Sequence, residues 1–178
     1  MLIRVFILIG FISFISCANP KPRKPISRTG SVDMSASIAL NKKLLLHEEN
    51  IFKAIIAKDT AHTYLDSHFG FWYTYDIKEE KNTPKPIKGN EVTFEYDVKN
   101  IEGKIIYSKE ELGDKTYLVD QQDFMQGIQE GIKLMKVNEK VIFLLPSQKA
   151  YAYYGDEKKI GSNTPLIVTI TLLEIKTN

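Results

Sequence analysis

Two segments in the middle of the chain alternate apolar and polar residues with a period of two. One runs from Phe71 to Ile77 and the other from Val92 to Val98. Successive side chains of a β-strand point to opposite faces, so this period indicates strands with one buried face. A chain built around such strands must form a sheet, and the apolar side of that sheet must be covered.

Further strands and one short helix complete this pattern. Four more apolar runs predict strands, at residues 140–145, 166–175, 105–106 and 117–119. Apolar residues spaced for one face of a short helix are Phe124, Ile128, Ile132 and Met135. Asp123 is a candidate cap for the start of that helix. We therefore predict an α+β fold over residues 66–178, in which a mostly antiparallel sheet wraps around one short helix.

A helical pattern precedes the sheet, over residues 35–60. Its apolar residues lie three, four and seven positions apart and are Leu44, Leu45, Ile51, Phe52, Ile55 and Ile56. The polar residues expected on the opposite side are Lys42, Lys43, Glu48, Glu49, Asn50 and Lys53. An apolar stripe of this length must be buried. We expect this amphipathic helix to pack on the following domain, with a homodimer through the helix as the alternative.

The start of the chain has the layout of an export signal. Residues 1–4 form a short basic segment. The 11 residues from 5 to 15 are mostly apolar, and Ser16 and Cys17 follow them. As a helix this run would span about 16 Å, which is too short to cross a bilayer but suits a secretory signal. The arrangement resembles bacterial lipoprotein signals, which are cut just before a cysteine that carries the lipid. We predict a signal peptide over residues 1–16 and lipidation of Cys17; an ordinary signal with an incidental cysteine is the alternative.

Residues 17–34 are predicted to form a tether. Pro20, Pro22 and Pro25 alternate there with lysine and arginine, and repeated proline favours an extended chain. The resemblance to lipoproteins implies a protein held at the cell envelope, facing the periplasm, with the outer membrane as the default.

Composition excludes several classes of function. The 24 basic and 22 acidic residues leave a net charge of +2, without the basic stripe that nucleic-acid binding needs. A single cysteine cannot build a disulfide framework. His47, His62 and His68 have no metal-binding spacing, and His47 is expected to be exposed on the charged helix. We predict no metal, no cofactor and no nucleic-acid partner.

Three stretches of the second half carry a more specific signal. Residues 92–108 form an alternating strand with Tyr96, a glycine seven residues later and a short strand that ends at a serine. Residues 124–140 hold a helix with two glycines four residues apart, and residues 145–151 contain Pro-Ser-x-x-Ala-Tyr. In this order and spacing, they resemble the FKBP family of peptidyl-prolyl cis-trans isomerases, over roughly residues 88–176. With its lipoprotein start and its Tyr-Tyr-Gly-Asp loop, the whole chain is most similar to the gliding-motility-associated isomerase lipoproteins of gliding bacteria.

The resemblance implies which residues form the site. Tyr96 and Tyr151 match catalytic pocket tyrosines, and the Tyr151 hydroxyl is expected to donate a hydrogen bond to the substrate. The substrate-binding positions implied by the family are Ile106, Tyr107, Tyr117, Phe124, Met125, Ile128, Ile160 and Val168.

Three of these positions depart from the family pattern. Ile106 stands where a phenylalanine is usual, Tyr107 where an aspartate is usual, and Ile128 where a tryptophan commonly forms the pocket floor. Asp156, in the loop after Tyr151, has no partner that would suggest acid–base chemistry. Tyr107 would remove a charged acceptor from the pocket. We therefore predict weak macrolide binding and reduced catalysis.

Two functions follow from the resemblance. The first is a peptidyl-prolyl isomerase that acts on proline-containing segments of exported proteins. The alternative is a non-catalytic binding or assembly module at the membrane, which holds a partner chain in the same groove.

Overall fold

The computed structural model describes residues 34–177, almost all of which belong to one compact unit, residues 37–178. The predicted signal peptide, Cys17 and all but the last residue of the predicted tether lie outside the described residues. Within the described part, no helix has the length and apolar character of a membrane span.

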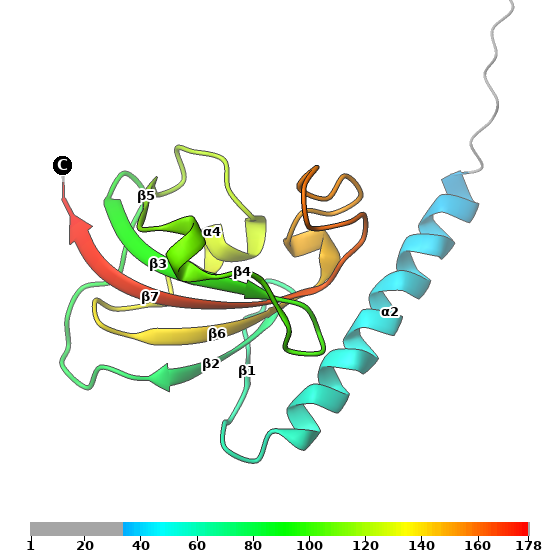
Figure 1. Ribbon diagram of the computed structural model, residues 1–178, viewed down its shortest axis with the longest axis horizontal. Coiled ribbons are helices and arrows are strands. Elements are labelled where there is room, and N and C mark those ends of the chain that lie inside the picture. Colours follow the sequence, from blue (N-terminus) through cyan, green and yellow to red (C-terminus); the bar gives the residue numbers. More distant parts are fainter. Residues whose placement is uncertain (1–33, 178) are drawn as a thin grey trace, which may run out of the picture. The chain divides into compact units, whose positions relative to one another are not determined.

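The unit is built on one antiparallel sheet with four helical elements (Figure 1). The strands are β1 (Leu65–Asp66), β2 (Trp72–Ile77), β3 (Glu91–Lys99), β4 (Ile105–Tyr107), β5 (Lys115–Leu118), β6 (Lys140–Leu145) and β7 (Leu166–Lys176). The helices are α2 (Met34–Lys58), α3 (Lys109–Leu112), α4 (Gln126–Ile132) and the 3₁₀ turn η1 (Ser147–Lys149). The strand order is β1-β2-β6-β7-β3-β4, with β5 paired to β3, and every pair is antiparallel.

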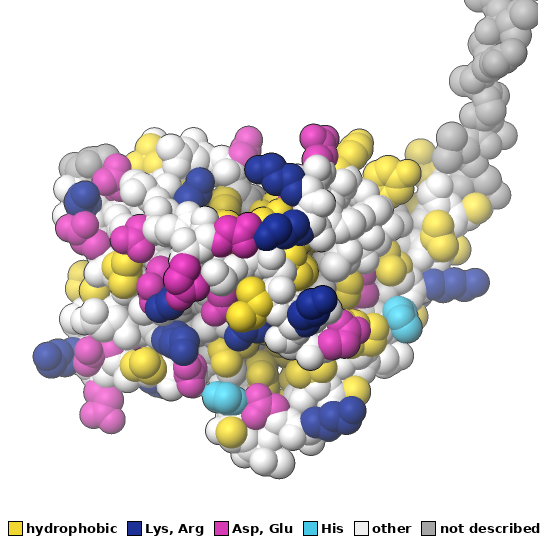
Figure 2. Space-filling view, in the orientation of Figure 1, with side chains coloured by type: hydrophobic (Ala, Val, Ile, Leu, Met, Phe, Trp, Pro, Cys, Tyr) yellow, Lys and Arg dark blue, Asp and Glu magenta, His cyan; other side chains and the backbone are white. Residues whose placement is uncertain are grey.

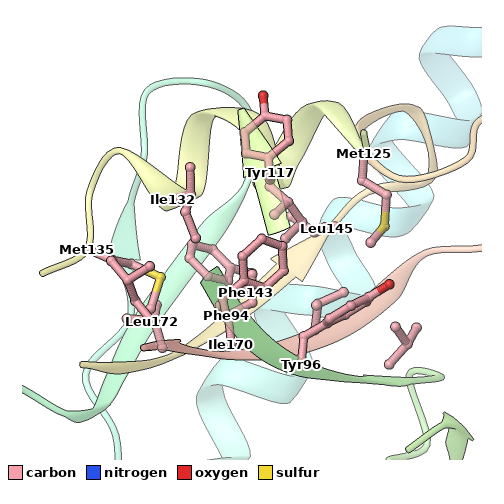
Figure 3. Packing of buried hydrophobic residues seen from close by; sticks show 14 of the residues in the cluster. Phe94, Tyr96, Tyr117, Met125, Ile132, Met135, Phe143, Leu145, Ile170 and Leu172 are labelled. Carbon is pink, nitrogen blue, oxygen red and sulfur yellow. The ribbon is translucent and has the colours of Figure 1, made fainter. Parts of the chain in front are cut away.

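The main core lies between the sheet and α4. The alternation predicted for β3 is confirmed, since Val92, Phe94, Tyr96 and Val98 are buried and the residues between them are less so. Figure 3 shows Phe94, Phe143 and Ile170 of three neighbouring strands packed together beneath the helix. Gly131 of α4 has no room for a side chain, because a Cβ there would lie 2.6 Å from the Phe143 ring. The helix can therefore approach the sheet closely only with glycine at this position.

Helix α2 packs on the other face of β2. The rings of Phe52 and Trp72 lie 5.9 Å apart, and Trp72 points away from the face that Phe71 and Tyr73 give to the main core. Leu144, which pairs with Trp72 across the strands, is also fully buried outside the main core cluster. The expectation that α2 packs on its own domain is therefore confirmed around Phe52.

Three details of the sequence prediction are wrong. Glu48, which was placed on the polar side of α2, is 1% exposed. Asp123 does not cap α4, because the helix begins at Gln126 after Met125, with no side-chain cap bond. The predicted fold also lacked β1, α3 and η1, which are each only two to four residues long.

The apolar stripe of α2 is not buried along its whole length. Leu45 of the predicted stripe is 39% exposed, and four further apolar residues of α2 are exposed, namely Met34, Ile38, Leu40 and Leu46. The homodimer through this helix stays a prediction. His47 is exposed, as the sequence predicted.

Candidate active site

A cavity of about 430 Å³ opens between the sheet, α3 and the loop that follows η1. Its walls are formed by Tyr96, Val98, Tyr107, Leu112, Tyr151, Gly155, Asp156, Glu157 and Lys158. Strands β3 and β4 supply the first three of these residues, because alternation points every second side chain of a strand toward the same face. On the face drawn in Figure 2, acidic and basic side chains are mixed and form no patch of one sign.

Two of the tyrosines in this cavity keep their hydroxyl groups free. Tyr96 is 8% exposed, and Figure 3 shows its hydroxyl pointing away from Phe94 and Ile170. Tyr151 is half-buried. Neither hydroxyl has a hydrogen-bond partner among residues 34–177, so both can donate to a molecule in the cavity.

Burial keeps these two phenols protonated. It raises the pKa of Tyr96 to about 12, with a smaller contribution from the nearby Tyr151 and Tyr107. The pKa of Tyr151 is also raised, first by burial and then by the charge of Asp156. Both side chains are therefore hydrogen-bond donors throughout the neutral pH range.

The hydroxyl of the third tyrosine, Tyr107, already has a hydrogen-bond partner. Its hydroxyl donates to the Asp156 carboxylate, and the Lys159 ammonium lies 4.5 Å from the centre of its ring. The bond to Asp156, followed by burial, raises the pKa of Tyr107. Burial alone would raise the pKa of Asp156, but hydrogen bonds from Tyr107 and from backbone amides of its own loop outweigh it and lower that pKa. At neutral pH the pair is a neutral phenol and a carboxylate.

The sequence analysis found no partner of Asp156 that would indicate acid–base chemistry, and the structure adds hydrogen-bond donors to this carboxylate. Its Oδ1 accepts hydrogen bonds from the backbone amides of Lys158, at 3.0 Å, and Ile160, at 2.7 Å, while Oδ2 accepts from Tyr107. Tyr107 does remove a carboxylate from β4. The loop after η1 supplies a different carboxylate to the cavity, that of Asp156.

Lys159 adds a second attachment between this loop and the β4–α3 segment. Its ammonium forms an ion pair with Glu111 and donates to the Ile106 carbonyl at 3.3 Å. The loop closes tightly at Gly155, where φ is +69° and a Cβ would lie 2.3 Å from the Ile160 carbonyl oxygen. Only glycine fits there, so the loop that forms one wall of the cavity depends on this residue.

The structure gathers Tyr96, Tyr107 and Tyr151 around the cavity, and the other predicted substrate contacts do not line it. Five of these other residues are fully or almost fully buried in the core, namely Tyr117, Met125, Ile128, Ile160 and Val168. Ile106 and Phe124 are partly buried and pack against that core. For these seven residues, contact with a substrate stays a prediction.

Several residues of the cavity were missed by the sequence analysis. Val98 had a usable signal, since it is the next inward residue of β3 after Tyr96. Leu112 lies in a single helical turn that is too short for a periodic pattern. Asp156 is 49 residues from Tyr107, and no local spacing relates the two.

An antiparallel sheet that holds a short helix, with a tyrosine-lined cavity beside it, defines an α+β protein with a binding pocket of apolar and polar walls. The family model described as FKBP-type peptidyl-prolyl cis-trans isomerase matches residues 82–173. The chain belongs to this family.

Two curated relatives agree with this assignment. A probable FKBP-type peptidyl-prolyl cis-trans isomerase FkpA of Neisseria meningitidis is 32% identical over 102 residues, which are 57% of this chain and 37% of that protein. FK506-binding protein 1B of Aspergillus fumigatus is 28% identical over 102 residues, which are 56% of this chain and 85% of that protein. The match thus spans little more than a third of the Neisseria relative.

Solved structures show the same fold. A peptidyl-prolyl cis-trans isomerase from Pseudomonas syringae superposes with a TM-score of 0.62 at 21% identity, and the match covers 76% of this chain and 96% of that one. FkpA from Escherichia coli superposes with a TM-score of 0.59 at 23% identity, covering 82% and 67%. The predicted α+β, FKBP-like fold is confirmed.

Proposed function

We propose that this protein catalyses the cis–trans isomerisation of peptide bonds that precede proline in exported polypeptides. The observation that carries the proposal is the pair of unpartnered hydroxyls, Tyr96 and Tyr151, in the cavity of a member of the isomerase family. Its apolar walls at Val98 and Leu112 suit a prolyl ring.

The chemistry of this reaction needs no nucleophile. Rotation about a peptide bond has a barrier of about 18–20 kcal/mol, because the nitrogen shares its lone pair with the carbonyl. Before proline the two planar forms differ by only about 0.5–1 kcal/mol, yet they exchange in tens of seconds or more. A protein that binds the twisted amide better than either planar form accelerates the exchange.

The cavity can favour the twisted amide in two ways. A twisted amide has lost its resonance and has a less polar carbonyl, so removal of water by apolar walls costs it less than it costs a planar amide. A fixed hydroxyl donor then holds the carbonyl in place. Tyr151 is the donor that we propose, because the hydroxyl of Tyr107 is committed to Asp156.

A proline-peptide assay tests this function. The chain from residue 31 onward keeps the compact unit 37–178 whole and is the material to use. We expect it to speed the cis–trans exchange of a chromogenic X-Pro peptide in proportion to its concentration. An exchange rate equal to that of the uncatalysed peptide would exclude catalysis. Binding of the same peptide without catalysis would support the alternative, a non-catalytic binding or assembly module.

The altered pocket also bears on macrolides. Because Tyr107 and Ile128 replace the aspartate and the tryptophan usual in the family, we propose that macrolide binding is weak. Calorimetric titration with such a macrolide measures this affinity directly.

We further propose that the protein is a lipoprotein of the cell envelope, anchored through Cys17 and facing the periplasm, with the outer membrane as the default. Support comes from the first 17 residues of the sequence. A role in assembling gliding-motility machinery is the finer proposal and rests on the similarity to that group of lipoproteins. Replacing Cys17 with serine should abolish lipid labelling and processing. A Cys17→Ser protein that is cleaved and held at the membrane like the parent would contradict the anchor.

A further inference from the structure

A buried carboxylate on α2 contacts the loop that leads to Tyr151. Glu48 is 1% exposed, and its Oε2 accepts a hydrogen bond from the backbone amide of Ser147 at 2.9 Å. The two residues are 99 positions apart in the sequence. This bond therefore joins a helix outside the family-matching segment 82–173 to the start of η1.

The backbone of Ser147 also holds the chain on both sides of Tyr151. Its carbonyl accepts hydrogen bonds from the amides of Ala150, at 3.1 Å, and Ala152, at 2.8 Å. Ser147 itself is fully buried. A set of hydrogen bonds thus runs from Glu48 to the N–H of Ser147, and from the C=O of the same residue to the two amides that flank Tyr151.

The backbone beside Tyr151 needs this support. Ala152 has a φ of +50°, a left-handed conformation that residues with a side chain adopt only when the surrounding structure imposes it. Loss of the Ser147 contact would let this turn relax. Movement of the turn would displace the Tyr151 hydroxyl from the cavity.

Stability alone gives a poor account of this carboxylate. Glu48 Oε1 and Ser147 Oγ are both buried and have no hydrogen-bond partner among the residues that the structure describes. Burying a carboxylate that is only half satisfied is costly, and an apolar residue of similar size would avoid the cost. A role other than packing therefore explains better why a glutamate occupies position 48.

We propose that Glu48 is a positioning residue of the isomerase site, which fixes the backbone of Ser147 and through it the placement of Tyr151. The inference rests on the proposed function. It makes α2 a working part of the site, and not only a connection to the start of the chain.

Three variants of the chain from residue 31 onward, with one control, separate positioning from packing. Glu48→Met keeps the length of the side chain and removes the acceptor, whereas Glu48→Gln keeps an acceptor oxygen. Glu48→Asp keeps the charge but withdraws it by one methylene, and it serves if Glu48→Met does not fold. Phe52→Leu is the matched control, because Phe52 lies one turn further along the same buried face, packs on Trp72 and has no side-chain acceptor for the Ser147 amide.

The expected result is a loss of turnover specific to Glu48. We expect Glu48→Met to lower kcat roughly tenfold with little change in KM, as loss of a hydrogen bond to a charged group implies. Glu48→Gln should stay close to the parent, and Glu48→Asp should fall between them. Phe52→Leu should lower the melting temperature and leave kcat unchanged well below that temperature.

Hydrogen exchange supplies a readout that does not depend on activity. The amides of Ala150 and Ala152 should exchange on the order of tenfold faster in Glu48→Met and at the parent rate in Phe52→Leu. Unchanged exchange at these amides in Glu48→Met would overturn the inference, even if the parent protein proved inactive. Equal losses of kcat in Glu48→Met and Phe52→Leu, in proportion to their losses of stability, would overturn it as well. A parent without isomerase activity would remove the proposed function, and the exchange data would still decide the role of Glu48.

Discussion

Tyr107 and Asp156 show how the carboxylate of a pocket can be supplied from a different position in the chain. The family pattern expects an acid at position 107, on β4, and this chain places a tyrosine there. The acid comes instead from the loop after η1, and the Tyr107 hydroxyl donates to it. The pocket thus keeps a carboxylate, but that carboxylate belongs to a loop whose position the pair helps to fix.

Removal of either partner should loosen this loop. We expect Tyr107→Phe to raise KM for a proline peptide roughly two- to tenfold, the effect of losing one hydrogen bond. Asp156→Ala should raise KM further, because Asp156 also accepts hydrogen bonds from the amides of Lys158 and Ile160. The double variant should be little worse than the worse single variant, because both remove the same interaction. Steady-state kinetics of the four proteins measures this coupling, and strictly additive effects would show that the pair does not act as a unit.

The pair should work over a wide pH range. The pKa of Asp156 is lowered from its ordinary value of 3.8, so its contribution is present above that value and is lost as the pH falls through the lower pKa of the folded protein. The raised pKa of Tyr107 keeps the donor protonated on the alkaline side. The coupling measured in the double variant should therefore be the same at pH 5 and pH 9.

At the scale of elements, a small polar cluster ties the end of α2 to the sheet. Asp59 follows α2 directly and lies 2.8 Å from His62 Nδ1. His62 Nε2 lies 3.7 Å from Asp76 of β2, and Lys140 of β6 lies 2.8 Å from the same carboxylate. Tyr64 donates a further hydrogen bond to Asp59. The cluster is fully formed only when His62 is protonated.

This cluster predicts a dependence of stability on pH. The hydrogen bond to Asp59 raises the pKa of His62 above 6.5, against the smaller opposing effect of burial. A raised pKa means that the stabilising contribution is fully present below 6.5 and is lost as the pH rises through the higher pKa of the folded protein. We expect the melting temperature to fall by about 1–3 °C through this transition.

Thermal unfolding followed by circular dichroism from pH 6 to pH 8 measures the effect. His62→Gln should remove the slope, and His47→Gln, at an exposed site on α2, should retain it. A slope that survives in His62→Gln would assign the pH dependence to other groups.

The elements also show what the sequence could predict. The strands were found because one side of each must be apolar, and β6 was predicted with its observed bounds, residues 140–145. Elements of two to four residues, such as α3 and η1, are too short for any period to register. Glu48 was misplaced because binary patterning assigns a charged residue to solvent. Its partner, the Ser147 amide, is a backbone group 99 residues away that no side-chain pattern reveals.

The site follows the same division. Tyr96 and Tyr151 were predicted because they lie in a strand and a loop that carry the family pattern. The contact between Tyr107 and Asp156 was not, because it depends on how two distant segments fold against each other. Ile128 and Val168 are buried in the core and are not among the residues that line the cavity, so their contact with a substrate stays a prediction.

At the scale of the whole molecule, the family domain and the helix before it act together. Helix α2 contributes Phe52 to a second buried cluster and Glu48 to the loop beside the cavity. Its first half leaves apolar side chains exposed, Ile38 and Leu40 among them. The molecule is thus an FKBP-type domain whose site is braced by a segment that lies outside the matched residues 82–173.

The central claim is that this cavity isomerises prolyl bonds with Tyr151 as the donor, and one comparison tests it most directly. The value of kcat/KM for a proline peptide should be measured for the parent, for Tyr151→Phe and for the control Tyr153→Phe, at a residue that is 69% exposed. We predict that Tyr151→Phe lowers kcat/KM roughly two- to tenfold at an unchanged melting temperature, the effect of one lost hydrogen bond, while Tyr153→Phe matches the parent. A Tyr151→Phe protein as active as the parent would contradict the claim.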